Sequence, residues 1–400
     1  MTTDREISHM SPPVRTVETR FDSLTGMRAF AALAVAIHHS IAFWPEFYVV
    51  EIIGKWGYLG VDFFFCLSGF VMQWAWTRGT TARRFLSRRF ARIYPLLVVT
   101  LLASLVAWWT IQNPLAGYAG PPRSVLFNLL AIQSWFFNDS TIRQSWNGVT
   151  WSLACEFFFY ACSPFILSRF AKLKPKSCFL LIGALYLGQC IAQALTAPGG
   201  SATVQNFFYF FPVARLPEFL MGALACQMFI SGYRTKIRSP LVSFALLVIV
   251  PLGVYAHVVS PAYQYLSVSS LIVLPGFVVT IIVAASRDSS TRHSRRPRFL
   301  ASRHMVWLGN VSYSYYVFHA LVLGAIGFAL IDWGFPPKTE LMGTLWLVVF
   351  LLSSLLVAWV AWRLIERPAQ RSIMSVICSP KKPKPVGIEI ATSPPPSVET

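Results

Sequence analysis

The chain has 400 residues, of which 55% are hydrophobic and only 12% are charged. A soluble chain carries about twice that charged fraction, so the composition excludes an ordinary soluble domain and indicates a membrane protein with many spans. The formal net charge of +18 does not indicate nucleic-acid binding, because the cations lie in loops between apolar segments.

Ten apolar segments are predicted to cross a bilayer as helices. In chain order they are 24–44, 57–77, 93–112, 149–168, 177–196, 206–230, 240–257, 264–285, 305–331 and 340–364. One further apolar segment, 124–137, is too short to span and is expected to be re-entrant or interfacial. We therefore predict an all-α polytopic fold with about ten transmembrane helices. It would comprise an N-terminal segment 1–23, a transmembrane domain 24–370 and a disordered, basic and proline-rich tail 371–400.

The loops alternate in charge along the chain. Basic clusters occur at 78–92, 169–176, 234–238, 287–303 and 367–384, whereas the intervening loops hold almost no cations other than Lys55, Arg123, Arg143 and Lys338. Because cationic loops stay on the cytoplasmic side, this pattern predicts that both termini are cytoplasmic. The expected location is the cytoplasmic (inner) membrane.

Four ionisable residues lie at a similar depth inside four different spans. At a helix rise of roughly 1.5 Å per residue, His39, Asp62, Glu156 and His319 would lie about 18 to 22 Å from the cytoplasmic surface. Ionisable groups at that depth are costly and usually face the interior of the bundle. We expect a polar chamber there, although His38 could be satisfied by a backbone carbonyl and Asp62 could be a structural residue near a helix start.

Glu156 is the hardest of these residues to explain as packing. Paired with an imidazole, its carboxylate would make a general-base dyad.

The seven cysteines lie mostly in spans and lack the spacing of zinc ligands, so we interpret them as reduced packing residues. We predict no metal site and no bound cofactor.

A pair of arginines stands at the cytoplasmic start of the third span. Arg89 and Arg92 are three residues apart and would share a helix face, a geometry suited to phosphate groups. Arg28 is expected at the same surface, at the foot of the helix that carries His39. Anionic lipid would satisfy these three residues equally well.

These motifs resemble those of the membrane-bound acyltransferase 3 family. The resemblance covers residues 24 to 370 in order, and only Thr25 and Ala29 depart from residues common in the family. The matching segments are Leu24-Thr-Gly-Met-Arg28 with His39, Gly60-Val-Asp-Phe-Phe-Phe-Cys-Leu-Ser-Gly-Phe70, Arg88-Arg-Phe-Ala-Arg-Ile-Tyr-Pro95, Trp151-Ser-Leu-Ala-Cys-Glu-Phe-Phe-Phe-Tyr160, Arg215-Leu-Pro-Glu-Phe-Leu-Met-Gly222, Leu308-Gly-Asn-Val-Ser-Tyr313, Tyr316 with His319, and Ile365-Glu-Arg-Pro368.

The resemblance implies transfer of a short acyl group from acyl-CoA to a hydroxyl of a polysaccharide, lipid-linked glycan, glycoside or macrolide. It places the critical basic residue and histidine at Arg28 and His39. We expect His39 to act as general base or acyl carrier, oriented by Glu156, while acyl-CoA is held by Arg28, Arg88, Arg89 and Arg92. Candidates for lining the chamber or binding the acceptor are Asp62, Ser68, Trp151, Tyr160, Arg215, Tyr313 and His319.

Two other functions are compatible with intramembrane polar residues. A proton-coupled transporter or lipid-linked sugar flippase could use His, Asp and Glu as a proton relay. The arginine pair beneath the Arg28–His39 helix argues against a transporter, which does not need it. An inactive scaffold would leave the polar residues without a role.

Overall fold

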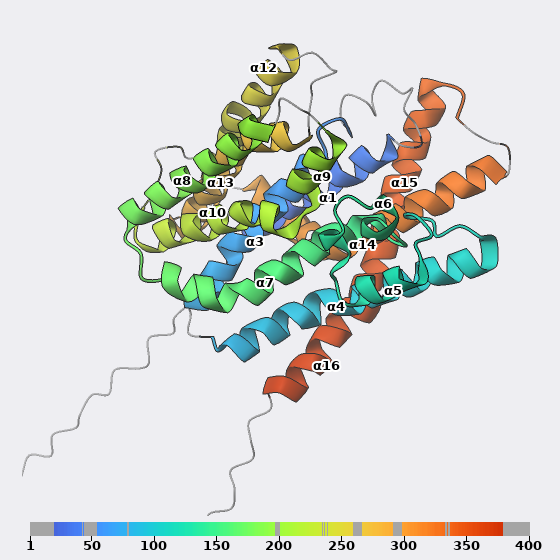
Figure 1. Cartoon of the computed structure of the whole chain (residues 1–400), viewed down its shortest axis with the longest axis horizontal. Helices are drawn as coiled ribbons and strands as arrows, with labels where there is room; N and C mark the ends of the chain where they lie inside the picture. Colours follow the sequence, from blue (N-terminus) through green and yellow to red (C-terminus); the bar gives the residue numbers. More distant parts are fainter. Residues whose placement is uncertain are drawn as a thin grey trace, which may run out of the picture.

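The computed structural model describes residues 20–41, 43, 54–77, 80–196, 201–233, 235, 237, 239–258, 266–290, 298–332, 334 and 337–378. Within them the chain is nearly all helical (Figure 1), and backbone pairing between extended residues is limited to two isolated bridges, Ala116 with Asn147 and Tyr118 with Ser145. The elements are α1 (Asp22–Ser40), α3 (Leu59–Thr77), α4 (Ala82–Ile111), α5 (Pro122–Leu129), η1 (Gln133–Trp135), α6 (Ser140–Arg143), η2 (Gly148–Thr150), α7 (Trp151–Phe170), α8 (Pro175–Thr196), α9 (Ala202–Phe210), α10 (Pro212–Ile230), α11 (Pro240–Phe244), the π-helical η4 (Ala245–Ile249), α12 (Val250–Val258), α13 (Leu266–Ser290), η6 (Phe299–Ala301), α14 (Arg303–Asp332), α15 (Glu340–Ala361), the π-helical η7 (Trp362–Glu366) and α16 (Arg367–Cys378).

Eight helical segments in the described part are long and apolar enough to cross a membrane. Two of the ten predicted spans fall outside this set. The segment 24–44 corresponds to α1, which has 19 residues and carries Arg28 and two histidines, and the segment 240–257 contains a shorter apolar helix, Pro240–Tyr255. The protein is therefore a multi-pass helical membrane protein with about eight candidate spans, and the count of ten and the side of the termini remain predictions.

Three predicted segments have different boundaries in the structure. The segment 206–230 is broken into α9 and α10, because Phe211 is extended and Pro212 starts a new helix without an N–H to donate. The segment 124–137 forms the eight-residue α5 and the short η1, neither of which is long enough to span. The helix α16 continues to Cys378, so the tail predicted to be disordered from residue 371 is helical in its first eight residues.

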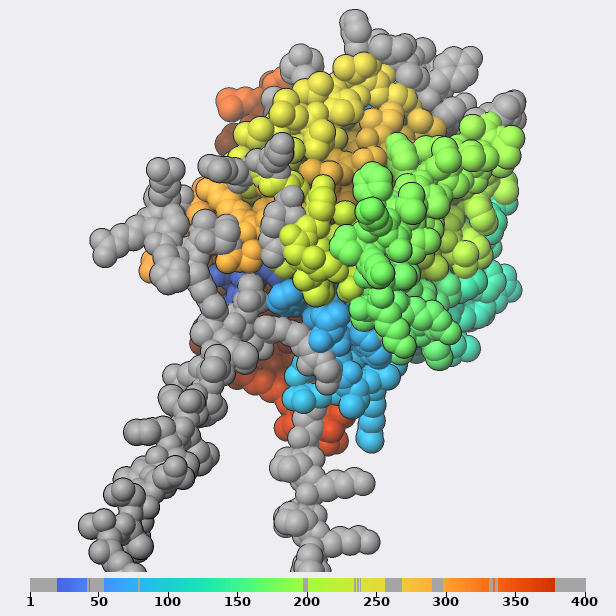
Figure 2. All heavy atoms as spheres, turned by 90° about the vertical axis from the view of Figure 1, so that its left-hand side faces the viewer, coloured from blue at the N-terminus to red at the C-terminus, as the bar shows by residue number. Residues whose placement is uncertain are grey.

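Helix α8 lies on the outside of the bundle. It is part of the green surface that faces the viewer in Figure 2, and Phe179, Leu187 and Leu195 on it are each more than half exposed. Exposed aliphatic and aromatic side chains along a whole helix are typical of a surface that contacts lipid hydrocarbon. The polar and charged side chains discussed below lie on the inner helices instead.

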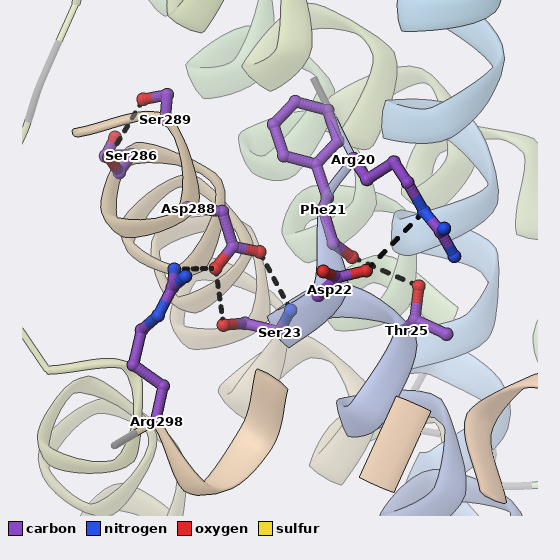
Figure 3. Close-up of polar contacts among 9 residues, drawn as sticks. All are labelled: Arg20, Phe21, Asp22, Ser23, Thr25, Ser286, Asp288, Ser289 and Arg298. Atoms are coloured by element: carbon purple, nitrogen blue, oxygen red, sulfur yellow. Dashed lines mark hydrogen bonds and ion pairs between the residues drawn. The ribbon is translucent and has the colours of Figure 1, made fainter. Parts of the chain in front are cut away.

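The first turn of α1 is capped by a carboxylate from another helix. Phe21 stands at the N-cap position and offers no side-chain hydrogen bond. Figure 3 shows that Asp288 on α13 replaces it: its oxygens accept from the Ser23 N–H at 2.8 Å and the Ser23 hydroxyl at 2.6 Å, and Arg298 pairs with it at 3.1 Å. A negative charge at a helix start satisfies free N–H groups and favours the helix dipole. This cap fastens α1 to α13.

Helix α1 is also held very close to α14. A Cβ atom on Gly309 of α14 would overlap the carbonyl oxygen of Thr25 on α1. Only glycine allows the two backbones to approach this closely. The contact sets the position of α1 relative to α14, and these two helices carry His39 and His319.

Replacing Gly309 by alanine should therefore push α1 and α14 apart. We expect Gly309→Ala to destabilise the protein by about 1 to 3 kcal/mol, as overpacking does elsewhere, and to lower its thermal transition in detergent. Gly183→Ala on α8 is the matched control, because nothing lies within 4 Å of the added Cβ. Equal transitions for the two variants would contradict the close packing of α1 on α14.

Candidate functional site

A cavity opens between α1, α3, α4, α7 and α14. We call it the inner cavity. Helix α1 contributes one lining residue, Arg28, and the other four helices contribute several each. The lining residues are Arg28, Val61, Phe64, Phe65, Leu67, Ser68, Val71, Met72, Arg89, Arg92, Ile93, Ser152, Leu153, Glu156, Tyr160, Ser312, Tyr313 and Tyr316.

Three arginines line this cavity without a contact counter-ion. Arg89 and Arg92 are three residues apart on α4 and both face the cavity, as does Arg28 from α1. Among the described residues, none of the three lies within 4.0 Å of a carboxylate oxygen, and the Nε of Arg89 is buried with no hydrogen-bond partner. The three side chains are partly buried, and guanidinium groups withdrawn from water without partners are costly, so the arrangement is suited to an anionic ligand.

Glu156 lies in the same cavity and contacts a tyrosine. Its Oε2 accepts a hydrogen bond of 2.8 Å from the Tyr160 hydroxyl, one turn further along α7. The described residues contain no hydrogen bond between Glu156 and His39, so the carboxylate expected to orient that imidazole stands among the arginines instead. Ser68 and Tyr313 also line the cavity, and the Tyr313 hydroxyl donates to the carbonyl of Ile93 at 2.8 Å.

A second cavity adjoins the first at the start of α1. We call it the vestibule. Arg28 and Arg92 line both cavities, as do Leu67 and Val71, so the two arginines stand where the cavities meet. The other vestibule residues are Arg20, Phe21, Asp22, Leu24, Thr25, Trp74, Asn310, Trp362, Glu366, Arg367 and Gln370.

His39 pairs with His319 at the end of α1 opposite to the vestibule. The Nδ1 of His319 lies 2.6 Å from the carbonyl oxygen of Tyr316, so it carries the proton and leaves Nε2 as an acceptor. The Nδ1 of His39 lies 3.0 Å from that Nε2 and 2.9 Å from the carbonyl oxygen of Val35, so it donates. These contacts fix one tautomer of His39, in which Nε2 has a free lone pair.

Tyr316 connects the inner cavity to the histidine pair. Its hydroxyl forms a 2.7 Å hydrogen bond with that of Ser152, and both residues line the cavity. Its carbonyl accepts the bond from His319, three residues later on α14. His38 makes a 2.9 Å hydrogen bond with the carbonyl of Gly54. None of His38, His39 and His319 lines either cavity.

Asp62 and Arg215 form a buried ionic cluster away from both cavities. Arg215 pairs with Asp62 at 2.8 Å and with Glu218 at 2.9 Å, and its guanidinium also stacks near Phe65 and Tyr209. All three charged side chains are at least 95% buried. The cluster joins α3 to α10, so these two sequence candidates hold helices together rather than line the chamber.

Two other candidates also lie outside the cavities. Trp151 is buried against the rings of Tyr209 and Phe210, at 5.1 and 4.8 Å between centroids. Arg88 is exposed on α4, while its neighbour Arg89 faces inward. The described part of the chain contains no group of three His, Cys, Asp or Glu residues that could hold a metal ion.

The sequence candidates did not include Glu366, Glu218 or Ser152. Glu366 and Glu218 lie inside motifs that the sequence analysis quoted, and the spacing of Arg215 and Glu218, three residues apart on one helix, was a signal for an ion pair. Ser152 lies on the helix that carries Glu156. Its role depends on Tyr316, which is more than 160 residues away in the chain.

The fold and the site together define an integral membrane protein with an arginine-lined cavity, one of whose lining residues, Tyr316, contacts a histidine pair. The chain matches the acyltransferase domain of the acyltransferase 3 family over residues 21–363. It therefore belongs to this family of membrane acyltransferases.

The curated relatives are acyltransferases. The chain is 30% identical to acyltransferase MdmB of Streptomyces mycarofaciens, over 76% of this chain and 79% of the relative. It is 24% identical to O-acetyltransferase OatA of Staphylococcus aureus and 24% identical to peptidoglycan O-acetyltransferase OatA of Listeria monocytogenes, but spans only 57% and 56% of their lengths. No solved structure matches the chain.

The ionic cluster predicts a loss of stability when Asp62 is neutralised. Asp62→Asn leaves Arg215 short of one buried partner, and we expect a destabilisation of about 3 to 5 kcal/mol, seen as a lower melting temperature in detergent. Asp22→Asn breaks the exposed pair with Arg20 at 3.7 Å and should cost less than about 1 kcal/mol. If Asp62→Asn kept full stability and lost only activity, Asp62 would belong to the reaction site.

Proposed function

We propose that the protein is an O-acyltransferase that moves a short acyl group from acyl-CoA to a hydroxyl of a carbohydrate, glycoside or macrolide. The observation that carries the proposal is a set of three partly buried arginines without contact counter-ions, all of which line the inner cavity and two of which, Arg28 and Arg92, also line the vestibule. The names of two relatives, O-acetyltransferase and peptidoglycan O-acetyltransferase, support transfer to a hydroxyl of a glycan. Family membership favours this function over a transporter.

The donor would lie along the two cavities. Its phosphates would bind in the vestibule near Arg28 and Arg92, because guanidinium groups bind phosphate oxygens through paired, charge-assisted hydrogen bonds. Its pantetheine arm would extend through the inner cavity toward Ser152 and Tyr316, beyond which lies the histidine pair. The basic loops predicted to be cytoplasmic would place the vestibule on the side where acyl-CoA is available.

His39 would act as the general base. A hydroxyl is a poor nucleophile at neutral pH, so its proton must leave as its oxygen attacks the thioester carbonyl. The free lone pair on His39 Nε2 accepts that proton, the new C–O bond forms, and the C–S bond breaks. The proton then passes to the CoA sulfur, which leaves as a thiol.

An acyl-histidine route uses the same atoms. In it, His39 Nε2 attacks the thioester first, CoA leaves as a thiol, and the acceptor hydroxyl then takes the acyl group from the imidazole. In both routes His319 keeps the proton of His39 on Nδ1. The second route would allow the acyl group to change sides of the membrane before the acceptor binds.

The first test of the proposal is substitution of His39. Wild-type protein in nanodiscs is incubated with acetyl-CoA or propionyl-CoA and with simple glycosides or a macrolide, and acylated product and free CoA thiol are measured. His39→Ala should lower turnover by at least about a hundredfold, the usual contribution of a general base. His38→Ala is the neighbouring control and should retain most activity. Full turnover by His39→Ala would rule out this mechanism.

The donor-binding role of the arginines predicts a change in KM. Arg92→Ala should raise the KM for acyl-CoA by about tenfold or more, because it removes a charged partner of the phosphates. The control is Arg84→Ala on the same helix, where the arginine is exposed and lines neither cavity. Similar KM values for both variants would place the donor elsewhere.

A further inference from the structure

A second buried carboxylate, Glu366, stands beside the arginines on the vestibule side. It ends the π-helical segment η7 and is only 3% exposed. Glu366 lines the vestibule, Glu156 lines the inner cavity, and Arg28 and Arg92 line both. The two arginines are therefore flanked by one carboxylate in each cavity.

Neutral hydrogen bonds hold Glu366 in place. Its Oε2 accepts from the Ser314 hydroxyl at 2.6 Å and its Oε1 accepts from the Gln370 amide at 3.1 Å. No cation lies within 4.0 Å of it among the described residues. Both of its contact partners are uncharged, so its negative charge remains available to act on its neighbours across the vestibule.

A carboxylate at this place has two opposite effects. It lowers the cost of keeping Arg28 and Arg92 partly buried when no ligand is bound, because opposite charges attract more strongly where water is partly excluded. It also repels the phosphates of any anionic ligand that binds to the same arginines. A site built only for tight anion binding would not contain it.

We propose that Glu366 is a positioning residue that sets the affinity of the site for CoA, by serving as counter-charge to Arg28 and Arg92 in the empty site and weakening their hold on the anionic product. The proposal rests on the proposed function for the identity of the anion. In each catalytic cycle the product CoA must leave the vestibule before the next acyl-CoA enters. Glu366 replaces the departing phosphates as the counter-charge of the arginines.

The test is CoA binding by variants of Glu366 in nanodiscs. Glu366→Gln keeps the size and polarity of the side chain but removes its charge, so CoA should bind about tenfold more tightly and inhibit turnover at correspondingly lower concentration. Glu366→Asp keeps the charge and should bind CoA within about twofold of wild type. A role limited to packing or hydrogen bonding predicts the reverse, with binding weakened or unchanged in Glu366→Gln.

A control variant separates this effect from a general change in charge. Glu340 is exposed in the first turn of α15 and lies roughly 39 Å from Glu366 along the same helix. The control variant is Glu340→Gln. Solvent and salt screen charges at that distance, so CoA binding should not change. Tighter binding in Glu340→Gln as well would overturn the assignment to Glu366.

Two further outcomes are decisive. If wild-type protein does not bind CoA, the proposed donor is wrong. If wild-type protein binds CoA but Glu366→Gln does not bind it more tightly, only the proposed role of Glu366 is overturned.

If Glu366→Gln cannot be recovered folded, Gln370→Glu is the second variant. It adds a second carboxylate beside Glu366 and should weaken CoA binding by about tenfold. Unchanged CoA binding in that variant would overturn the proposal.

Discussion

The charge of a guanidinium group inside an apolar helix bundle must be balanced by other groups, and this protein balances it in two different ways. Arg215 contacts two carboxylates and two aromatic rings, and it lines neither the inner cavity nor the vestibule. Arg28, Arg89 and Arg92 have carboxylates nearby but none in contact, and they face open space. Arg215 is almost fully buried and the three cavity arginines are partly exposed, so contacts and exposure together distinguish a structural cluster from a binding site.

Helix α1 determines how the two parts of the site are spaced. Arg28 and His39 are eleven residues apart, which is about three helical turns and roughly 16 Å, so both lie on one face of the helix. Asp288 fastens the start of α1 to α13, and Gly309 brings α14 against it near Thr25. The distance from the charged end to the histidine pair is therefore built into one rigid helix and its close contact with α14.

The sequence could assign each polar residue an expected depth but could not predict its partners. Helix rise gives the depth of a side chain in the membrane but not the direction in which it points around the helix axis. Residues expected at similar depth therefore separate into three groups: His39 with His319, Asp62 with Arg215, and Glu156 with the arginines. The hydropathy pattern located most spans, whereas the break at Phe211 and Pro212 and the extension through α16 depend on local backbone geometry and on packing.

No carboxylate contacts the histidine pair among the described residues, and this affects the proposed chemistry. In a serine–histidine–aspartate site the carboxylate contacts the histidine and stabilises the imidazolium that forms. Here the described contacts of His39 are a neutral imidazole and a backbone carbonyl, which fix its tautomer but provide less stabilisation for a positive charge. In the proposed mechanism, a proton accepted by His39 Nε2 would therefore be held weakly and would pass readily to the leaving sulfur. The carboxylates Glu156 and Glu366 line the same cavities as the arginines instead, where they would act on binding of the proposed anionic donor.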